Sequence, residues 1–288
     1  SQFGLVDVDE GSIDTLEHAH GTKSTIAHFE LVSEVGRGAF GSVWHAHDSK
    51  LDRKVALKVP RPGQFSQSSR EQFLREARAA AQLSHPNIVS IHEVGLDDDR
   101  IYIVSDFVDG VSLADLLSAQ RLSPREAIKL CVKVSLALEH AHENGVIHRD
   151  LKPANIMLGE NNEPFVMDFG LAKRLDEDSS QTKSGAVMGT PSYMAPEQAA
   201  SNSATLGPAA DTYALGAILY HMLTGRPPFQ AETQLDTIMQ VIGEEPIAPR
   251  RLNSTVPVDL ETITLKCLQK EIGRRYDSAE ALAEDLRR

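Results

Sequence analysis

Two short strings in the middle of the chain carry side chains that could transfer a phosphoryl group. His-Arg-Asp-Leu-Lys-Pro-Ala-Asn ends at Asn155, and Asp-Phe-Gly begins thirteen residues later at Asp168. Asp150 can orient a hydroxyl and accept its proton, and Lys152 can place a positive charge beside a moving phosphate. Asn155 and Asp168 offer the hard oxygen ligands that hold Mg²⁺ against a polyphosphate. Phosphoryl transfer depends mainly on positioning and charge neutralisation, and the two strings supply both.

A glycine-rich stretch upstream could cover the phosphates. It reads Val-Gly-Arg-Gly-Ala-Phe-Gly-Ser-Val, and the same spacing of glycines also occurs in dinucleotide-binding folds, where a helix begins at the last glycine. Here the chain continues as Ser-Val-Trp-His-Ala-His, which alternates like a strand. We predict a strand, a glycine turn that offers backbone N–H groups to phosphates, and a second strand; a plain glycine-rich hairpin is the alternative for the stretch alone. The predicted phosphate-loop residues are Val35, Gly36, Arg37, Gly38, Ala39, Phe40, Gly41, Ser42 and Val43.

A strand that carries a lysine and a helix that carries a glutamate come next. Val-Ala-Leu-Lys-Val has the period of two of a strand and puts Lys58 beside a small alanine, where an unpaired ammonium is costly to bury. Ser68 and the glutamate three residues later have the spacing of a capping box, which predicts the start of a helix. Glu76 within that helix is the best candidate partner of Lys58. The alternative is a solvated Glu76 that pairs locally with Arg70 or Arg75.

The rest of the chain divides into an acidic start, a strand-rich part and a helical part. Residues 1–28 carry five carboxylates against one lysine, which predicts a flexible extension. Alternating apolar residues over about 29–105 predict a small, mostly antiparallel sheet that holds the glycine loop. Residues 106–110 are interpreted as a connection, and about 111–288 as a larger, mainly helical part that holds Asp150.

Capping signals locate helices of the larger part. Ser123 opens Ser-Pro-Arg-Glu, a capping box with proline at the first helical position, and Gly145 ends that helix just before the His-Arg-Asp string. Asp211 is predicted to begin a long apolar helix that ends at Thr224, because glycine and a pair of prolines follow. Residues 278–288 have the period of a final amphipathic helix.

The composition is that of a globular protein long enough for two lobes. The chain has 288 residues, of which 41% are hydrophobic, and no run approaches the roughly eighteen apolar residues of a membrane span. We expect a reducing, cytoplasmic location, because the sequence shows no signal-peptide pattern and its cysteines, Cys131 and Cys267, form no disulfide framework or metal-site pattern. The net charge of −12 argues against general nucleic-acid binding.

Taken in order, these strings resemble the protein kinases, and in particular the bacterial Hanks-type (eukaryotic-like) serine/threonine protein kinases. Gly-Thr-Pro-Ser-Tyr-Met-Ala-Pro-Glu, which ends at Glu197, is similar to the end of the family's activation segment, and Arg275 is similar to the late arginine that pairs with Glu197. Ile272 departs from the proline that relatives commonly carry, which affects a turn. The resemblance covers about 29–288 and implies a bilobal α+β kinase fold, with a small antiparallel-sheet N-lobe that has one key helix and a larger, mainly helical C-lobe.

The resemblance implies an ATP-dependent serine/threonine protein kinase that transfers the γ-phosphate to Ser and Thr hydroxyls of proteins. Asp150 would be the catalytic base, and Lys152, which tyrosine kinases usually replace, would stabilise the transferring phosphate. Lys58, paired with Glu76, would hold the α- and β-phosphates, and Thr190 would hydrogen-bond the base and the catalytic-loop lysine. The implied ligands of Mg²⁺, with Mn²⁺ as an alternative, are Asn155 and Asp168.

The resemblance also assigns an adenine pocket. By alignment with the family, Ser105 is the gatekeeper at the back of the pocket, where most relatives carry a larger residue. The backbone of Asp106 and Val108 would meet the adenine edge. A serine would leave space behind the base, unless neighbouring side chains already fill it. The expected apolar walls are Val35, Val43 and Ala56 above the adenine and Met157 below it.

We expect the segment between Asp168 and Glu197 to be phosphorylated in trans, which a homodimer would allow. Arg149 stands beside the base and, with Lys173 or Arg174, would form a cluster of cations that a phosphate of about −2 charge joins. The alternative is that the hydroxyls of this segment only keep a loop soluble. The candidate phosphorylation sites are Thr182 and Ser184 first, and then Ser179 and Ser180.

Two other function classes share the predicted fold. A catalytically silent binding module would normally have lost the strand lysine, the base or a metal aspartate, and this chain keeps all three. A small-molecule kinase would lack the Ala-Pro-Glu segment that shapes a groove for protein substrates, and this chain has it. The expected partners are therefore ATP and protein substrates, without nucleic acid or a membrane segment.

Overall fold

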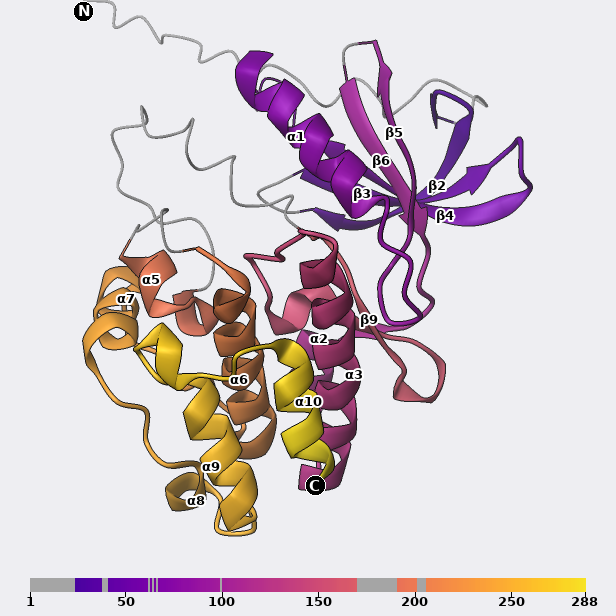
Figure 1. The fold of residues 1–288 in the computed structure, drawn as a ribbon. Helices are drawn as coiled ribbons and strands as arrows, with labels where there is room; N and C mark the ends of the chain where they lie inside the picture. The colour runs from indigo at the N-terminus through magenta and orange to yellow at the C-terminus, as the bar shows by residue number, and fades with distance from the viewer. Residues whose placement is uncertain are drawn as a thin grey trace, which may run out of the picture.

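The computed structural model consists of a small lobe built on an antiparallel sheet and a larger lobe built mainly from helices (Figure 1). This arrangement confirms the predicted bilobal α+β fold. No helix within the described ranges is both long enough and apolar enough to span a membrane. The structure describes residues 24–37, 41–61, 63, 65, 67–98, 100–169, 191–200 and 206–288.

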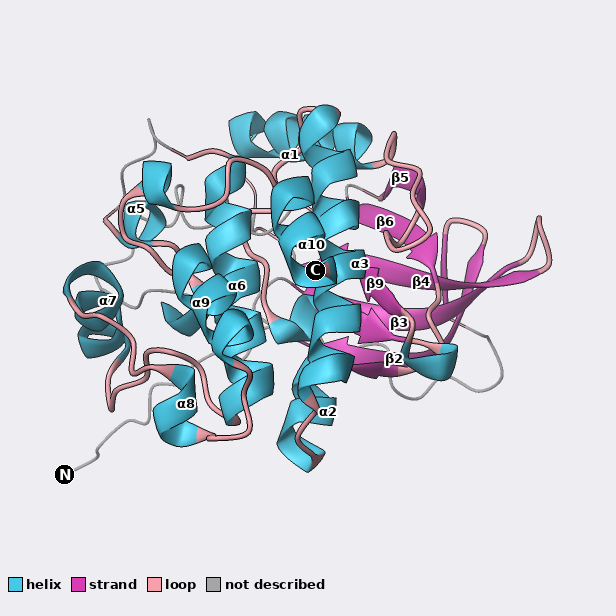
Figure 2. Cartoon of the chain, turned by 60° about the horizontal axis from the view of Figure 1, so that its bottom comes forward, coloured by secondary structure: helices cyan, strands magenta, loops and turns pink. Residues whose placement is uncertain are grey.

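The small lobe is a sheet of β1 (Thr25–Ile26), β2 (Phe29–Arg37), β3 (Gly41–Asp48), β4 (Arg53–Pro60), β5 (Ile91–Asp97) and β6 (Arg100–Asp106). The strands pair antiparallel in the order β1-β2-β3-β4-β6-β5, and Figure 2 shows them in magenta on one side of the molecule. Successive side chains of a strand point to opposite faces. On β6, Tyr102 and Val104 therefore join one apolar cluster, whereas Ile101 and Ile103 join another on the opposite face.

One helix of the small lobe, α1 (Gln67–Ala80), packs on this second face through Phe73 and Ala77. The predicted capping box at Ser68 is wrong. An N-cap residue lies at the boundary of a helix, whereas α1 begins at Gln67 and Ser68 lies inside it. Three serines lie within residues 66–69, so the spacing alone did not identify the residue at the boundary.

The sheet begins earlier than predicted. Thr25–Ile26 pairs with β2 and Ile26 is buried, so regular structure reaches into the segment 1–28 that was predicted as a flexible extension. A two-residue strand has too little periodicity to be recognised in a sequence. The prediction for residues 1–23 lies outside the described residues.

The large lobe is arranged around α6 (Pro208–Thr224), most of which is buried. Its other helices are α2 (Leu113–Ala119), α3 (Pro124–Glu143), α5 (Pro196–Ala199), α7 (Gln234–Gly243), α8 (Pro249–Leu252), α9 (Val258–Cys267) and α10 (Ala279–Arg287). Short 3₁₀ turns are η2 (Pro153–Asn155), η3 (Glu160–Asn162), η5 (Pro191–Tyr193) and η7 (Ile272–Arg274). A small sheet contains β7 (Val111–Ser112), β8 (Ile156–Leu158) and β9 (Pro164–Val166). Strand β7 precedes the string that ends at Asn155, and β8 and β9 follow it. Helix α6 contacts both α3 and α9, and α10 packs along α3 (Figure 1).

The helix boundaries of the large lobe follow the predicted capping signals, except at the start of α6. At the start of α3 the N–H of Ser123 donates to Glu126 Oε2 at 2.8 Å, and the N–H of Glu126 donates back to Ser123 Oγ at 3.3 Å, which confirms the capping box. Gly145 adopts φ +72° just after that helix, as its predicted role requires. Helix α6 starts at Pro208 instead of Asp211, because proline is tolerated at the first helical position and an acidic residue is also favourable in the first turn.

Candidate active site

A buried carboxylate holds the backbone that leads to the predicted base. Asp211, in the first turn of α6, is 1% exposed. Its Oδ1 accepts the N–H of Arg149 at 2.9 Å, and its Oδ2 accepts the N–H of His148 at 2.8 Å and lies 2.8 Å from His142 Nε2. Arg149 has φ +65°, which non-glycine residues seldom adopt, so the carboxylate stabilises a strained turn immediately before Asp150.

The predicted catalytic side chains meet at this turn. Lys152 Nζ lies 2.7 Å from Asp150 Oδ2. Asn155 Nδ2 donates to the main-chain oxygen of Asp150 at 2.8 Å and to its Oδ2 at 3.3 Å. The Asp150 side chain is still 31% exposed. A hydroxyl from outside can therefore approach a carboxylate whose orientation is held by two neighbours.

A second group of predicted residues joins the two lobes. Lys58 Nζ, on β4, lies 2.9 Å from an Oδ2 of Asp168, which follows β9 in the large lobe. The two groups are connected through His148, whose Nε2 lies 2.9 Å from the main-chain oxygen of Met167. Phe169 is buried, and its ring centroid lies 4.8 Å from that of His148. The backbone that carries Asp168 is therefore fixed to the same loop that carries the predicted base.

The oxygen donors here suit a hard cation. Asn155 bonds Asp150 through its amide nitrogen, so its carbonyl oxygen is the atom left for a metal, and Asp168 supplies a carboxylate. Across the part of the chain that the structure describes, no three His, Cys, Asp or Glu residues gather into a metal cage. Mg²⁺ is commonly bound by one or two carboxylates together with water and substrate phosphates, so this donor set fits a metal that arrives with a polyphosphate.

Helix α1 reaches the catalytic loop through a glutamate. Glu76 Oε1 lies 3.7 Å from Arg149 Nη1. Within the described residues, the buried Nε of Arg149 has no hydrogen-bond partner. The pairing of Lys58 with Glu76 stays a prediction. The observed contact puts the helix glutamate within reach of the arginine beside the predicted base.

Strand pairing places several of the predicted adenine-pocket residues on the neighbouring strands β3, β4 and β6. Ala56 pairs directly with Ser105, and Val43 pairs with Lys58 on the next strand. The N–H of Asp106 donates to the main-chain oxygen of Ser90 at 3.0 Å, and Ser105 Oγ lies 3.5 Å from the main-chain oxygen of Asp106. The remaining members lie on β2, in the connection and on β8: Val35, Val108 and Met157.

The predicted strands on either side of the glycine-rich turn are β2 and β3, which pair antiparallel. Gly41 has φ +151°, and an added Cβ would collide with the main chain of Val59, so only glycine fits there. Gly36 differs, because an added Cβ would meet no atom of the described residues within 4 Å. The guanidinium of Arg37 bonds the carboxylate of Glu34 at 2.7 and 2.9 Å. The turn residues Gly38, Ala39 and Phe40 lie outside the described residues.

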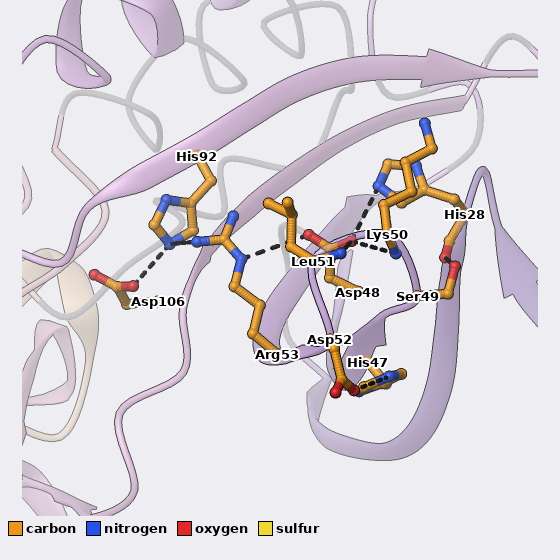
Figure 3. Close-up of polar contacts among 10 residues, drawn as sticks. All are labelled: His28, His47, Asp48, Ser49, Lys50, Leu51, Asp52, Arg53, His92 and Asp106. Atoms are coloured by element: carbon orange, nitrogen blue, oxygen red, sulfur yellow. Dashed lines mark hydrogen bonds and ion pairs between the residues drawn. The ribbon is translucent and has the colours of Figure 1, made fainter.

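A row of polar and charged side chains, whose contacts the sequence did not predict, reaches Asp106 at the connection between the lobes (Figure 3). His92 Nε2 lies 2.7 Å from Asp106 Oδ1 and 3.3 Å from Arg53 Nη1. Arg53 Nε in turn lies 3.5 Å from Oδ2 of the buried Asp48. These contacts restrain the side chain of Asp106, whose backbone is expected to bind adenine. Partners 39 and 14 residues apart leave no local signal in the sequence.

Helix α5 and the segment before it are each anchored to the core of the large lobe at one residue, Glu197 and Tyr193. Arg275, whose side chain is 0% exposed, donates to both carboxylate oxygens of Glu197 at 2.7 and 2.8 Å, which confirms the expected pair. Tyr193 OH lies 2.7 Å from His221 Nδ1. Burial lowers the pKa of His221 and raises the pKa of Tyr193 to about 12, so the neutral imidazole accepts and the phenol donates.

Several predicted residues fall in the part of the chain that the structure leaves undescribed. They include the threonine expected to bond the base, the cations expected near a phosphate, and the candidate phosphorylation sites. These residues are Thr190, Lys173, Arg174, Ser179, Ser180, Thr182 and Ser184.

Comparisons with known proteins agree with this geometry. A family model described as protein kinase domain matches residues 29–286. The chain is 39% identical over 265 residues to the serine/threonine-protein kinase PknB of Mycobacterium tuberculosis, which covers 90% of this chain and 42% of PknB. It is 36% identical over 264 residues to the serine/threonine-protein kinase PrkC of Bacillus subtilis, which covers 90% of this chain and 40% of PrkC. A crystal structure of the M. tuberculosis PknI kinase domain superposes with a TM-score of 0.75 at 27% identity, covering 93% of this chain and 98% of that domain.

Proposed function

Because this chain belongs to the protein kinase family, as a serine/threonine kinase domain that spans about two-fifths of the length of its curated relatives, we propose that Asp150 is its catalytic base. The observation that carries the proposal is the triplet in which Lys152 and Asn155 both bond an Asp150 carboxylate that stays accessible. We further propose that the domain acts in the cytoplasm on protein substrates, with ATP as the phosphate donor.

The proposed reaction needs little covalent chemistry from the protein. The hydroxyl oxygen of a Ser or Thr substrate forms a bond to the γ-phosphorus as the bond to the β–γ bridging oxygen breaks, and ADP leaves. Asp150 orients the hydroxyl and takes up its proton, and the Lys152 ammonium offsets the charge on the transferring group. Mg²⁺, held by Asn155 and Asp168 when bound, would neutralise the phosphate oxygens. Lys58 exchanges its contact with Asp168 for the α- and β-phosphates.

A transfer assay with radiolabelled ATP tests this function. The acceptors are a basic protein and the domain itself, and Lys58→Met is the inactive control, because a methionine keeps the length of the side chain but removes the charge that holds the phosphates. Labelled phosphoserine or phosphothreonine from the wild type and none from the control is the expected result. Equal labelling by both proteins would show a contaminating kinase, and the absence of labelling would contradict the proposal.

We propose that phosphorylation of the segment between Asp168 and Glu197, by a second copy of the chain, activates the domain. Two observations support a switch at Arg149: its guanidinium lies near Glu76, and its buried Nε has no partner among the described residues. A phosphate of about −2 charge would attract Arg149 and release Glu76 for Lys58. Helix α1 would then be placed for phosphate binding.

Phosphate on Thr182 or Ser184 is the expected result when the domain is produced in active form, with Ser179 and Ser180 as lesser sites. Mass spectrometry of the wild type and of Asp150→Asn, both produced without another kinase, measures it. The variant should carry none and should gain phosphate at these sites when mixed with the wild type, because the reaction occurs in trans. Phosphate that persists on the variant alone would rule out autophosphorylation.

The small side chain at the gatekeeper position, Ser105, predicts that the wild type binds bulkier adenine analogues than a variant with a larger side chain there. Ser105 is partly buried and lies directly across from Ala56, so an adenine analogue with a bulky aromatic substituent has room behind the base. We expect the wild type to bind such an analogue about tenfold more tightly than Ser105→Met, with kcat for ATP within about threefold in both. Titration calorimetry with the analogue and with ATP measures the two affinities. Equal affinities for the analogue would show that Ser105 does not face the pocket.

A further inference from the structure

Gln198 links two parts of the site that are far apart in sequence. It lies in α5, next to the anchored Glu197, and is 7% exposed. Its Oε1 accepts the N–H of Ala195 at 3.1 Å, and its Nε2 donates to the main-chain oxygen of Arg149 at 2.8 Å. A buried amide group therefore bonds the segment before α5 on one side and the catalytic loop on the other.

With the bond from Gln198, both the N–H and the carbonyl of Arg149 are hydrogen-bonded to side chains. The N–H of Arg149 is held by Asp211 Oδ1 at 2.9 Å, and its carbonyl is held by Gln198. That carbonyl shares a planar peptide unit with the N–H of Asp150. Fixing the carbonyl therefore fixes the rotation of the peptide that enters Asp150, at a residue whose φ of +65° is unfavourable without support.

The other end of Gln198 reaches Ala195, which ends the segment 191–195 and begins the Ala-Pro-Glu string that the resemblance assigns to the protein-substrate groove. Ala195 is fully buried and directly precedes α5. A displacement of this segment would move the Gln198 side chain, and the side chain would move the Arg149 carbonyl. The position of the segment and the orientation of Asp150 are in this way joined by two hydrogen bonds.

We propose that Gln198 is a positioning residue that sets the peptide plane before Asp150 according to the position of the segment 191–195. The proposal rests on the proposed role of Asp150 as the base. The plainer interpretation is that Gln198 only caps α5, because a glutamine at the third helical position commonly accepts the N-cap N–H. Capping uses Oε1 alone, whereas positioning also needs the donor Nε2, so the two roles can be separated.

Gln198→Glu separates them, because it keeps the acceptor for Ala195 and loses the donor to Arg149. At pH 8 we expect kcat for a protein substrate to fall about ten- to a hundredfold while KM for ATP stays within about threefold. A carboxyl group that faces a carbonyl oxygen favours its protonated form, and the protonated group can donate. The ratio of variant to wild-type kcat should therefore rise at least about threefold between pH 8 and pH 6.

Two further variants complete the experiment. Gln198→Met has no donor at any pH, so its kcat should be low and its ratio to wild type flat across the same range. Glu126→Ala removes the equivalent acceptor from the capping box of α3, away from the site, and should leave kcat unchanged. Binding of a fluorescent ATP analogue and thermal unfolding report on the fold of each protein.

The outcomes separate this proposal from the proposed function. An inactive wild type, or an active Asp150→Asn, contradicts the proposed function itself. With an active wild type, a Gln198→Glu kcat within twofold of wild type at pH 8, or a kcat ratio that stays flat down to pH 6, overturns the positioning role. If Gln198→Glu does not fold, Gln198→Met decides, and a kcat within twofold of wild type overturns the role. Failure of both variants to bind the ATP analogue also overturns it, because Gln198 would then act on the fold alone.

Discussion

Asp150→Asn is expected to lower kcat by about 10²- to 10⁴-fold, the contribution typical of a positioned general base, and to leave ATP binding intact. An asparagine keeps the shape of the side chain and its bonds to neighbours, but it cannot take up the proton of the attacking hydroxyl. The base acts on the acceptor and not on the nucleotide, so KM for ATP should change little. Steady-state assays at varied ATP and varied protein substrate measure both constants.

A second variant, Lys152→Met, tests the contribution of the neighbouring ammonium separately from that of Asp150. It removes the ammonium that lies 2.7 Å from the same carboxylate but leaves the base in place, so its kcat should fall while some dependence of rate on pH from Asp150 persists. Near-normal phosphorylation by Asp150→Asn, with Lys58→Met inactive in the same preparation, would remove Asp150 from the role of base and leave phosphate binding by Lys58 intact.

Arg275→Met is expected to lower the free energy of unfolding by about 3–5 kcal/mol, because it leaves the buried Glu197 carboxylate without its counter-ion. The side chains of Arg275 and Glu197 are 0% and 8% exposed, so water cannot replace the lost bonds. Urea unfolding followed by circular dichroism measures the change, and kinase activity should fall with it because Glu197 anchors the segment before α5.

The adjacent residue provides a matched control. Arg274 forms an ion pair with Glu271 at 2.9 Å, but the two side chains are 65% and 70% exposed. Arg274→Met should therefore cost at most about 1 kcal/mol. Adding Glu197→Gln to Arg275→Met should recover part of the loss, since the uncompensated buried charge disappears. Equal losses for Arg275→Met and Arg274→Met would contradict the assigned burial effect.

Local features of this chain were predictable because their determinants are close in sequence. Asp150, Lys152 and Asn155 stand within six residues, so residue type and spacing together define the turn in which they meet. The capping box at Ser123 is local for the same reason. The pair of Glu197 with Arg275, 78 residues apart, was expected only from the family resemblance.

Contacts between distant elements were not predictable from residue types. Gln198 reaches a carbonyl 49 residues away, and nothing in its neighbourhood distinguishes it from a glutamine that caps a helix. The start of α6 shows the same limit, because Asp211 satisfies the rules for a helix start and is instead used in the first turn to hold the catalytic loop. Which of several suitable partners a polar group takes is decided by the packing of the whole lobe.

If Lys58 and Asp168 bind the phosphates and the metal as proposed, their ion pair allows the domain to discriminate among adenine compounds. The two lobes are joined covalently by the connection after β6, and this ion pair is a further contact between them. In the proposed site, adenosine would bind at the connection without disturbing the contact, whereas a triphosphate with its metal would replace both partners of it. Only a ligand that satisfies the ammonium and the carboxylate at once recovers the electrostatic energy lost when they part. Adenine alone would therefore not determine which ligand binds the proposed site, because binding would also depend on the polyphosphate.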